Sequence, residues 1–176
     1  MLKTLLKEVK EYKKASILTP VMMLLEVVFE TLIPLLMGMI VDISGDGHID
    51  MKRVLLLGGA MLVLAAGGLW SGIMGGKYGA EASTGFGKNL RKTMFERIQG
   101  FSFANIDRFS TSSLVTRMTT DVTNIQNAYQ MILRMAMRAP SSLIISMVMA
   151  FLIEPRIALI YLMAVIFLGV TGGFLI

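Results

Sequence analysis

Residues 54–102 read VLLLGGAMLVLAAGGLWSGIMGGKYGAEASTGFGKNLRKTMFERIQGFS and decide the fold of this chain. They contain no proline and no cluster of turn-forming residues, which predicts one uninterrupted helix. At 1.5 Å per residue this helix is about 70 Å long, whereas the hydrocarbon core of a bilayer is roughly 30 Å thick. Only its first part, to about Gly76, is apolar enough to lie in a membrane, so the rest must project beyond it.

The projecting half has the pattern of a helix that packs against neighbours in water. Its apolar residues recur at helical spacing and are Phe86, Leu90, Met94, Ile98 and Phe101. Its other faces carry the basic residues Lys88, Arg91, Lys92 and Arg97. The third apolar segment has the mirror-image pattern, because residues 114–138 are amphipathic before the chain becomes fully apolar.

Small residues recur at every fourth position along the same helix, which is the spacing of a helix-packing surface. They are Gly68, Gly72, Gly76, Ala80 and Thr84. In lipid, where apolar side chains gain nothing by leaving the solvent, such a stripe lets another backbone approach closely. We expect Gly68, Gly72 and Gly76 to pack against another helix and to have no catalytic role.

Two glycine–lysine pairs, at 76–77 and 87–88, do not form a phosphate-binding loop. That loop needs a glycine six residues before the lysine and a Ser or Thr directly after it. This chain has Ser and Ala at the first position and Tyr and Asn at the second. We therefore expect no nucleotide site, no catalytic residue and no cofactor in this chain, which is not an enzyme on its own.

The composition indicates an all-α membrane protein. Hydrophobic residues make up 55% of the chain and charged residues 16%, with a mean hydropathy of +0.68, outside the range of soluble domains. The predicted spans are residues 15–41, 54–76 with an extension to about 102, 115–153, and 157–176, where the sequence ends inside a span. A cleaved signal peptide is the alternative for the first segment, which is however too long, contains two Glu and lacks a small-x-small cleavage site.

Other classes of site find little support in the residue content. Cys is absent and His48 is the single histidine, which excludes thiolate metal sites and leaves no pair of imidazoles, so we expect no metal site. The formal net charge is +5, but the basic residues flank apolar runs and do not form a patch interleaved with aromatics. We therefore expect no nucleic-acid partner, and a lipid bilayer as the partner.

Basic residues are distributed unevenly among the connections between spans. Residues 1–14 and 77–138 carry an excess of Lys and Arg, whereas residues 42–53 contain three Asp against two basic residues. The positive-inside rule places the first two segments in the cytoplasm. The prediction is a multi-pass protein of the cell membrane with a cytoplasmic N-terminus.

Apolar residues also recur at helical spacing ahead of the first span, within residues 1–14, with lysines on the remaining surface. They are Leu2, Leu5, Leu6, Val9 and Tyr12. This pattern predicts an amphipathic helix lying in the headgroup plane. A solvated basic tail is the alternative.

Residues 101–126, FSFANIDRFSTSSLVTRMTTDVTNIQ, connect the second span to the third. Asp107 and Ser110 are natural helix N-caps, and Asp121 lies one turn beyond Arg117. The segment therefore predicts a short capped helix that joins the two projecting helices at their cytoplasmic tip. A plain polar turn is the alternative, because capping residues are common at any helix start.

Four ionisable residues occur at membrane depth, Glu26, Glu30, Arg134 and Arg138. Each like-charged pair is spaced by four residues and so shares one helical face. Glu26 is sixteen residues before Asp42 and Arg138 is sixteen before Glu154, which places both roughly 24 Å below the outer surface. We predict that a Glu of the first span pairs with an Arg of the third along the substrate pathway. The alternative is that the arginines extend to lipid headgroups.

On these residues the chain resembles the membrane domain of ATP-binding-cassette exporters of the multidrug type, over essentially its whole length. The most specific match is to the family's first intracellular loop, in Asp107, Arg108, Phe109, Ser110, Thr111, Leu114, Arg117, Asp121 and Val122. Further matches are Glu26, Pro34 and Asp42, then Arg134 and residues 138–140, then residues 154–156. One departure is Ser112-Ser113, where the family usually has a Gly after Ser-Thr, so the start of the coupling helix is not fixed.

The resemblance implies the type I exporter fold, with an elbow helix at residues 1–14, six spans and a C-terminal nucleotide-binding domain that binds ATP and Mg. Two spans and that domain are not in this chain, which we expect to be unstable alone. It also implies a coupling helix that contacts the nucleotide-binding domain, through Asp107, Arg108, Phe109, Ser110, Thr111 and Leu114. A second half-transporter, identical or different, is the implied partner, and the segment at 138–140 is typical of halves of heterodimers.

The function expected from these features is that of a transmembrane subunit of an ATP-driven exporter. The sixteen Met would suit a cavity for varied hydrophobic small molecules, although packing is an alternative use for them. An ion-coupled secondary transporter is the competing reading, because it would use the charges at membrane depth and need no ATPase. The long projecting helices favour the exporter over this carrier, and over a membrane scaffold that assembles through its glycines.

Overall fold

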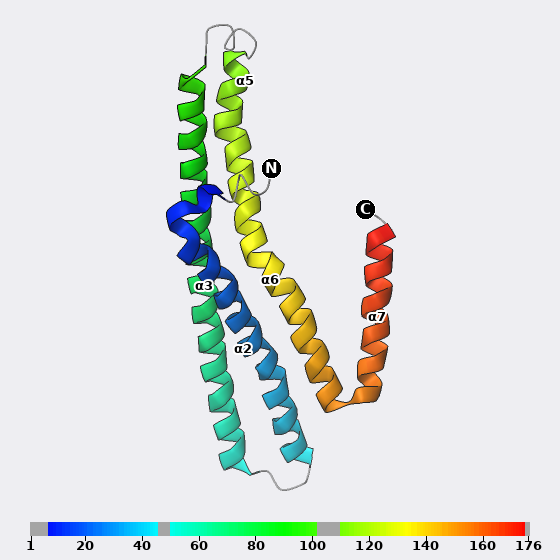
Figure 1. Ribbon diagram of the computed structural model, residues 1–176. Coiled ribbons are helices and arrows are strands. Elements are labelled where there is room, and N and C mark those ends of the chain that lie inside the picture. The colour runs from blue at the N-terminus through cyan, green and yellow to red at the C-terminus, as the bar shows by residue number, and fades with distance from the viewer. Residues whose placement is uncertain (1–6, 46–49, 102–109, 175–176) are drawn as a thin grey trace. The chain divides into compact units, whose positions relative to one another are not determined.

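A computed structural model describes residues 7–45, 50–101 and 110–174 of the chain. All regular structure in these residues is helical (Figure 1). In chain order the elements are η1 (Lys7–Tyr12), α2 (Lys13–Gly45), α3 (Met51–Gln99), α5 (Thr111–Thr116), η2 (Arg117–Asp121), α6 (Val122–Ile153) and α7 (Pro155–Phe174).

The long helix expected over residues 54–102 is present as α3, whose 49 residues span about 74 Å. A second helix of similar length, the third long helix in chain order, forms because α5, η2 and α6 follow one another without a break, from Ser112 to Ile153. Within the described residues these two and the helix that ends at Ile43 are long and apolar enough to cross a membrane, and α7 adds a shorter apolar helix. The predicted all-α membrane fold is confirmed.

The chain divides into two compact units, each built from two separate stretches of sequence. Unit 1 comprises residues 1–25 and 69–137, and unit 2 comprises residues 26–68 and 138–176. The helices α2, α3 and α6 each contribute one part to each unit.

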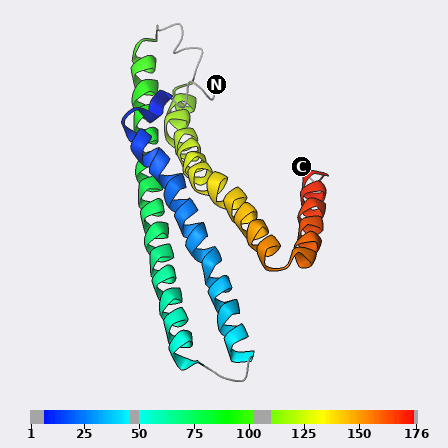
Figure 2. The ribbon, with the colours of Figure 1, turned by 60° about the horizontal axis from the view of Figure 1, so that its bottom comes forward.

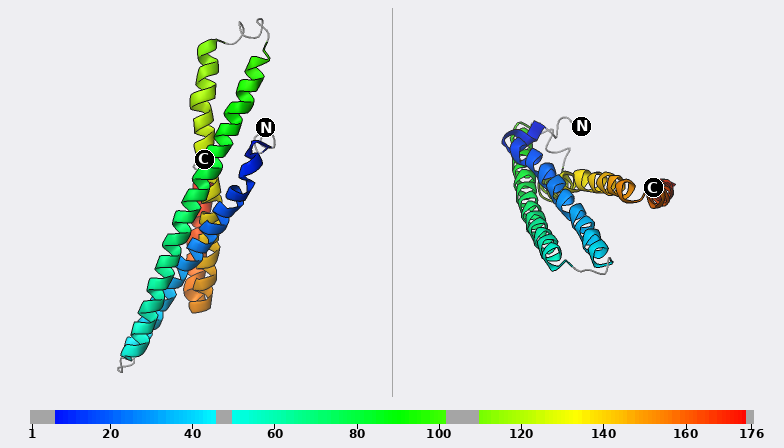
Figure 3. Two further views of the ribbon diagram at one scale, coloured as in Figure 1. Left: turned by 90° about the vertical axis from the view of Figure 1, so that its left-hand side faces the viewer. Right: turned by 90° about the horizontal axis from the view of Figure 1, so that it is seen from below.

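Unit 1 has a hydrophobic core between η1, α3 and α6, whose facing parts run side by side (Figures 1 and 3). The core consists of Val9, Phe86, Leu90 and Val122, with Tyr12, Met94 and Tyr129 packed against it. The ring centroids of Phe86 and Tyr129 are 4.7 Å apart, and the Tyr129 hydroxyl donates to Ser16 Oγ at 2.9 Å. The stripe predicted from Phe86 and Leu90 onward therefore packs against neighbouring helices, as expected.

The segment ahead of α2 differs from the amphipathic helix expected there. Its described part is the 3₁₀ helix η1, which is interrupted at Lys10, where φ is 36°. Val9 and Tyr12 pack into the core of unit 1, and the position of this segment in the headgroup plane stays a prediction. The predicted apolar residues Leu2, Leu5 and Leu6 lie outside the described residues.

Small residues of α3 do allow close packing in unit 1, but on a face shifted by one residue from the predicted stripe. The buried run is Ser71, Gly75, Gly79, Ser83 and Gly87. A Cβ atom at Gly79 would lie 3.3 Å from Thr19 Cγ2, so α2 passes close to the α3 backbone here. A Cβ at Gly76 would meet nothing within 4 Å, Gly72 is half-buried, and Ala80 is exposed. Gly76 therefore makes no close helix contact within the described residues, and its packing against another helix stays a prediction.

In unit 2, the last part of α2 runs beside the first part of α3 (Figure 2). A Cβ at Gly68 would lie 3.6 Å from Phe29 Cβ, and one at Gly67 would lie 3.2 Å from the Phe29 ring, so the α3 backbone lies close to α2 here. Thr31 Oγ1 donates to the Val27 carbonyl at 2.6 Å, which satisfies this hydroxyl within its own helix. The chain reverses direction between α6 and α7 with Glu154 as the linking residue, at the sharp turn the sequence indicated.

Candidate functional site

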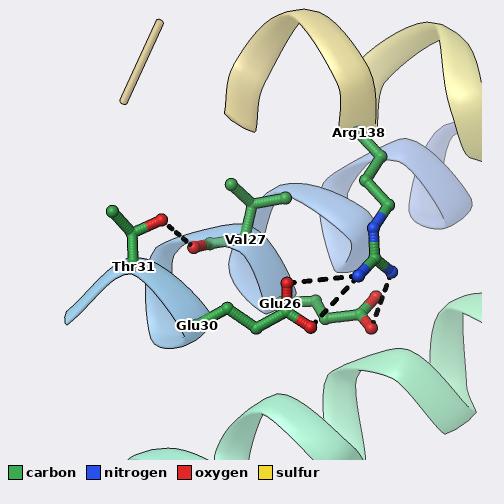
Figure 4. Close-up of polar contacts among 5 residues, drawn as sticks. All are labelled: Glu26, Val27, Glu30, Thr31 and Arg138. Atoms are coloured by element: carbon green, nitrogen blue, oxygen red, sulfur yellow. Dashed lines mark hydrogen bonds and ion pairs between the residues drawn. The ribbon is translucent and has the colours of Figure 1, made fainter. Parts of the chain in front are cut away.

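The charged residues at membrane depth form an ion-pair cluster in unit 2. Glu26 and Glu30 share one face of α2, and Arg138 of α6 extends toward both (Figure 4). Arg138 Nη1 donates to Glu26 Oε1 at 2.8 Å, while Nη2 donates to both carboxylate oxygens of Glu30 at 3.1 Å. The pairing of a Glu from the first span with an Arg from the third is present in the structure, and it involves both carboxylates at once.

The two carboxylates of this Glu26–Glu30–Arg138 cluster differ in burial. The Glu26 side chain is 14% exposed, the Glu30 side chain 54% and the Arg138 side chain 40%. Glu26 Oε2 is shielded and has no hydrogen-bond partner in the part of the chain that the structure describes. A shielded carboxylate depends on its cation far more than an exposed one does, so Arg138 contributes mainly through Glu26. Two carboxylates against one guanidinium leave the cluster with one excess negative charge.

Arg134 does not join this cluster. It belongs to unit 1, where the carbons of its side chain lie beside Gly79, 3.7 Å from the position of a Cβ there. It makes no ion pair within residues 7–45, 50–101 and 110–174. Spacing alone had placed Arg134 and Arg138 on one face, and the packing of α6 decides that Arg138 reaches the carboxylates.

The third long helix begins at Ser110, one of the two N-caps that the sequence indicated. Ser110 Oγ accepts a hydrogen bond from the Ser113 backbone N–H at 3.3 Å. The helix that it caps continues from α5 into η2 and α6, so Ser110 starts the third long helix and not a separate connecting helix. The reason is that residues 111–121 contain no Gly or Pro that would end a helix. The predicted contact residues Asp107, Arg108 and Phe109 lie outside the described residues.

Leu114 of α5 lines an apolar groove at this end of unit 1, with a volume of about 220 Å³. The lining residues are Met94, Arg97, Ile98, Phe101, Leu114 and Arg117. Three of them belong to the apolar stripe that the sequence predicted for the projecting half of α3. This stripe therefore packs tightly at Phe86 and Leu90 and leaves unfilled space beyond Met94.

Comparison with known proteins identifies the family. The model of the ABC transporter transmembrane region matches residues 16–175. The chain belongs to this family. The uncharacterised ABC transporter ATP-binding protein YfiB of Bacillus subtilis (strain 168) is 36% identical over 133 residues, which cover 74% of this chain and 23% of that protein. Uncharacterised ABC transporter ATP-binding proteins of Mycobacterium bovis and Mycobacterium tuberculosis are 28% identical over 177 residues, covering 100% of this chain and 30% of each protein.

The ABC transporter transmembrane region in this chain therefore spans less than a third of the length of these relatives. The family agrees with the multi-pass membrane location that the apolar helices indicate.

A polar clamp between η1 and α3 of this ABC transporter region was missed from the sequence. Asn89 Nδ2 donates to the Glu8 carbonyl and Thr93 Oγ1 to Glu8 Oε2, both at 2.9 Å, while Lys10 Nζ lies 3.0 Å from the same carboxylate oxygen. Burial by itself would raise the pKa of the Glu8 carboxyl, but hydrogen bonds from Lys10 and Thr93 and the charges of Lys10 and Arg97 hold it below its usual range. The one signal in the sequence was Asn89, directly before Leu90 of the apolar stripe. A polar side chain that is buried there needs a hydrogen-bond partner.

Proposed function

We propose that this chain is the transmembrane part of an ATP-driven exporter of the multidrug type, forming part of its substrate pathway and its first contact with a nucleotide-binding domain. The observation that supports this most is the length of its helices. About 20 residues cross a bilayer, whereas α3 has 49 and Ser112–Ile153 has 42. The part of each helix that exceeds the bilayer suits a transporter whose membrane helices are moved from the aqueous side by a soluble ATPase.

The proposed orientation has the N-terminus and the connection between α3 and α5 in the cytoplasm. It rests on the excess of Lys and Arg in residues 1–14 and 77–138. The segment Asp107–Leu114 would then face the nucleotide-binding domain, with Arg108 and Phe109 among its contacts. Closure of that domain around ATP and Mg would move the long helices as levers and expose the pathway to alternate sides of the membrane.

The proposed pathway contacts are Glu26, Glu30, Arg134 and Arg138. Charges at membrane depth cost on the order of 3 kcal/mol each, so they are retained where they face a cavity or a partner. The Glu26–Glu30–Arg138 cluster joins α2 to α6 in this conformation, and an alternating-access cycle would open it in another. Charge exchange tests this part, since Glu26→Arg and Arg138→Glu should each reduce transport and the double exchange should restore some of it. A double exchange no better than either single variant would remove the cluster from the mechanism.

The partners proposed for the full-length protein follow from the same reading. They are a second half-transporter, identical or different, and a hydrophobic small molecule as the transported substance. The apolar helices α2, α3, α6 and α7 contact lipid on the faces that no other part of the transporter covers. ATP and Mg would bind only to the nucleotide-binding domain, so this chain by itself would not hydrolyse ATP.

An ion-coupled secondary transporter is the second candidate, and the excess negative charge of the Glu26–Glu30–Arg138 cluster is the observation that favours it. The two candidates differ in their energy source. Transport by the full-length protein in vesicles should need ATP and persist when the proton gradient is dissipated. Transport that continues without ATP and stops with the gradient would favour the carrier.

The contact with the nucleotide-binding domain is tested by ATP hydrolysis in the full-length protein. We expect Thr111→Ala combined with Leu114→Ala to abolish the stimulation of ATP hydrolysis by transported substrate while leaving basal hydrolysis in place. Asn124→Ala, at an exposed position on the same helix, serves as the control. Stimulation that survives in the double variant would contradict the assigned contact.

A further inference from the structure

The third long helix changes its hydrogen-bonding pattern once along its course through unit 1. Between α5 and α6, residues Arg117–Asp121 form the π-helical segment η2, while the flanking residues Thr116 and Val122 keep ordinary helical angles. A π-helical turn is wider than an α-helical turn, occurs mostly as a single turn inside an α-helix and is frequent at functional sites. The helix is therefore continuous but locally irregular at this one place.

Threonine hydroxyls bond to the backbone on both sides of η2. Thr116 Oγ1 donates to the Ser112 carbonyl at 3.0 Å, Thr119 Oγ1 to the Val115 carbonyl at 2.8 Å, and Thr123 Oγ1 to the carbonyl of Thr119 at 2.8 Å. Hydroxyl bonds of this kind slightly destabilise a helix and often bend it. Threonine is also among the weaker helix formers, because its β-branched side chain is restricted there.

Packing changes abruptly at the same place. Val122, directly after η2, is 1% exposed and belongs to the core of unit 1. Just beyond it, Arg91 Nη2 of α3 donates to Thr123 Oγ1 at 3.0 Å, and Tyr129 stacks on Phe86. Within η2 no residue is buried, and ahead of it Leu114 borders the 220 Å³ groove. Val122 and Tyr129 thus anchor the helix on one side of η2, whereas none of residues 112–121 is buried.

From these observations we propose that Arg117–Asp121 is a bending joint, about which the arm Thr111–Thr116 moves relative to the anchored part of the helix. The irregular hydrogen bonds lower the cost of bending at the joint, and the unfilled groove gives the arm room to move toward α3. The anchored part does not move with it, because the core of unit 1 holds Val122.

The use of this joint in transport rests on the proposed function. In that function, a nucleotide-binding domain that contacts the arm would both displace and tilt it during each cycle. A rigid helix would pass every part of that motion to the membrane. A joint would absorb the tilt and transmit the displacement along the helix.

Hydrogen exchange followed by mass spectrometry tests the joint in the full-length transporter. Backbone amides of residues 117–121 should exchange at least about tenfold faster than those of residues 124–133, because local opening is cheapest where packing and hydrogen bonds are poorest. The variant Thr116→Ala/Thr119→Ala should slow exchange at the joint about fivefold, since Ala has the higher helix propensity. The matched control Asn124→Ala/Asn127→Ala changes two exposed residues of the anchored part and should leave exchange at the joint unchanged.

Equal exchange rates in residues 117–121 and 124–133 would contradict the proposed bending joint. Unchanged exchange at residues 117–121 in Thr116→Ala/Thr119→Ala would contradict it as well. Because exchange is measured without reference to transport, this result does not depend on the exporter proposal. If exchange behaves as expected, the same variant should also transport less substrate per ATP hydrolysed. Unchanged transport per ATP would overturn the role of the joint in coupling, and absence of any ATP-driven transport in the unaltered protein would overturn the exporter proposal instead.

Discussion

The unequal burial of Glu26 and Glu30 predicts an unequal response when Arg138 is removed. In Arg138→Met the shielded Glu26 carboxylate loses its cation, and breaking a buried pair from one side costs about 3 kcal/mol. Glu30 is 54% exposed and, in the proposed function, its exposed side faces a water-filled pathway, where a pair contributes at most about 1 kcal/mol. Most of the loss in Arg138→Met should therefore come from Glu26.

A second substitution separates the two carboxylates. Replacing Glu26 by Met in the Arg138→Met background removes the uncompensated charge and should recover about 2 kcal/mol, because apolar replacement of a whole buried pair is nearly neutral. Replacing Glu30 in the same background is the matched control and should recover less than about 1 kcal/mol. The measurement is the free energy of unfolding of the full-length protein in detergent, titrated with SDS. Equal recovery by the two replacements would refute the assignment of Glu26 as the carboxylate that depends on Arg138.

Four further substitutions test the packing of unit 1 by thermal unfolding of the full-length protein. Gly85→Ala would press a Cβ against the ring of Tyr12 and should destabilise by about 1–3 kcal/mol, whereas Gly76→Ala, with open space around it, should be neutral or slightly stabilising. Tyr129→Phe removes one hydrogen bond to α2 and should cost about 0.5–1.5 kcal/mol. Glu8→Gln should destabilise at neutral pH, and its difference from the unaltered protein should shrink as the pH falls below about 4.3, the ordinary Glu value.

The sign of the pH effect follows from the lowered pKa of Glu8. A carboxyl whose pKa is lower in the folded state stabilises that state above its unfolded pKa and loses this contribution as the pH falls through the folded pKa. A Glu8→Gln difference that grows on acidification would contradict the polar clamp. Equal effects of Gly85→Ala and Gly76→Ala would contradict the packing of η1 on α3. No loss in Tyr129→Phe would show that its hydroxyl does not tie α6 to α2.

The fold could be predicted because its signals are local. Residues 54–102 contain no proline and no cluster of turn-forming residues, and a helix of that length exceeds the thickness of a bilayer. Both properties follow from the sequence alone, and α3 has both. That a Glu of the first span lies near an Arg of the third could be predicted as well, since helical rise places Glu26 and Arg138 at the same depth below the outer surface.

Details that depend on packing could not be read from spacing. Gly76 and Gly79 belong to two runs of small residues with the same four-residue period. The run with Gly79 is the buried one because it shares a face of α3 with Phe86, which the period alone does not indicate. The choice of Arg138 over Arg134 likewise depends on how α6 lies against α2. The arrangement of η1 depends on the backbone turn at Lys10, a non-glycine residue with φ of 36°, which no sequence pattern indicates.

The most direct test of the account is the position of α3 relative to the membrane. Single spin labels can be placed at Phe95 and Leu62, both exposed and about 50 Å apart along α3, once any cysteines outside these 176 residues have been replaced. In the full-length protein in bilayers, the label at Phe95 should be accessible to a water-soluble relaxation agent and the label at Leu62 to oxygen dissolved in lipid. A label at Phe95 that lies at headgroup depth or in the hydrocarbon would contradict the claim that these helices extend well into water.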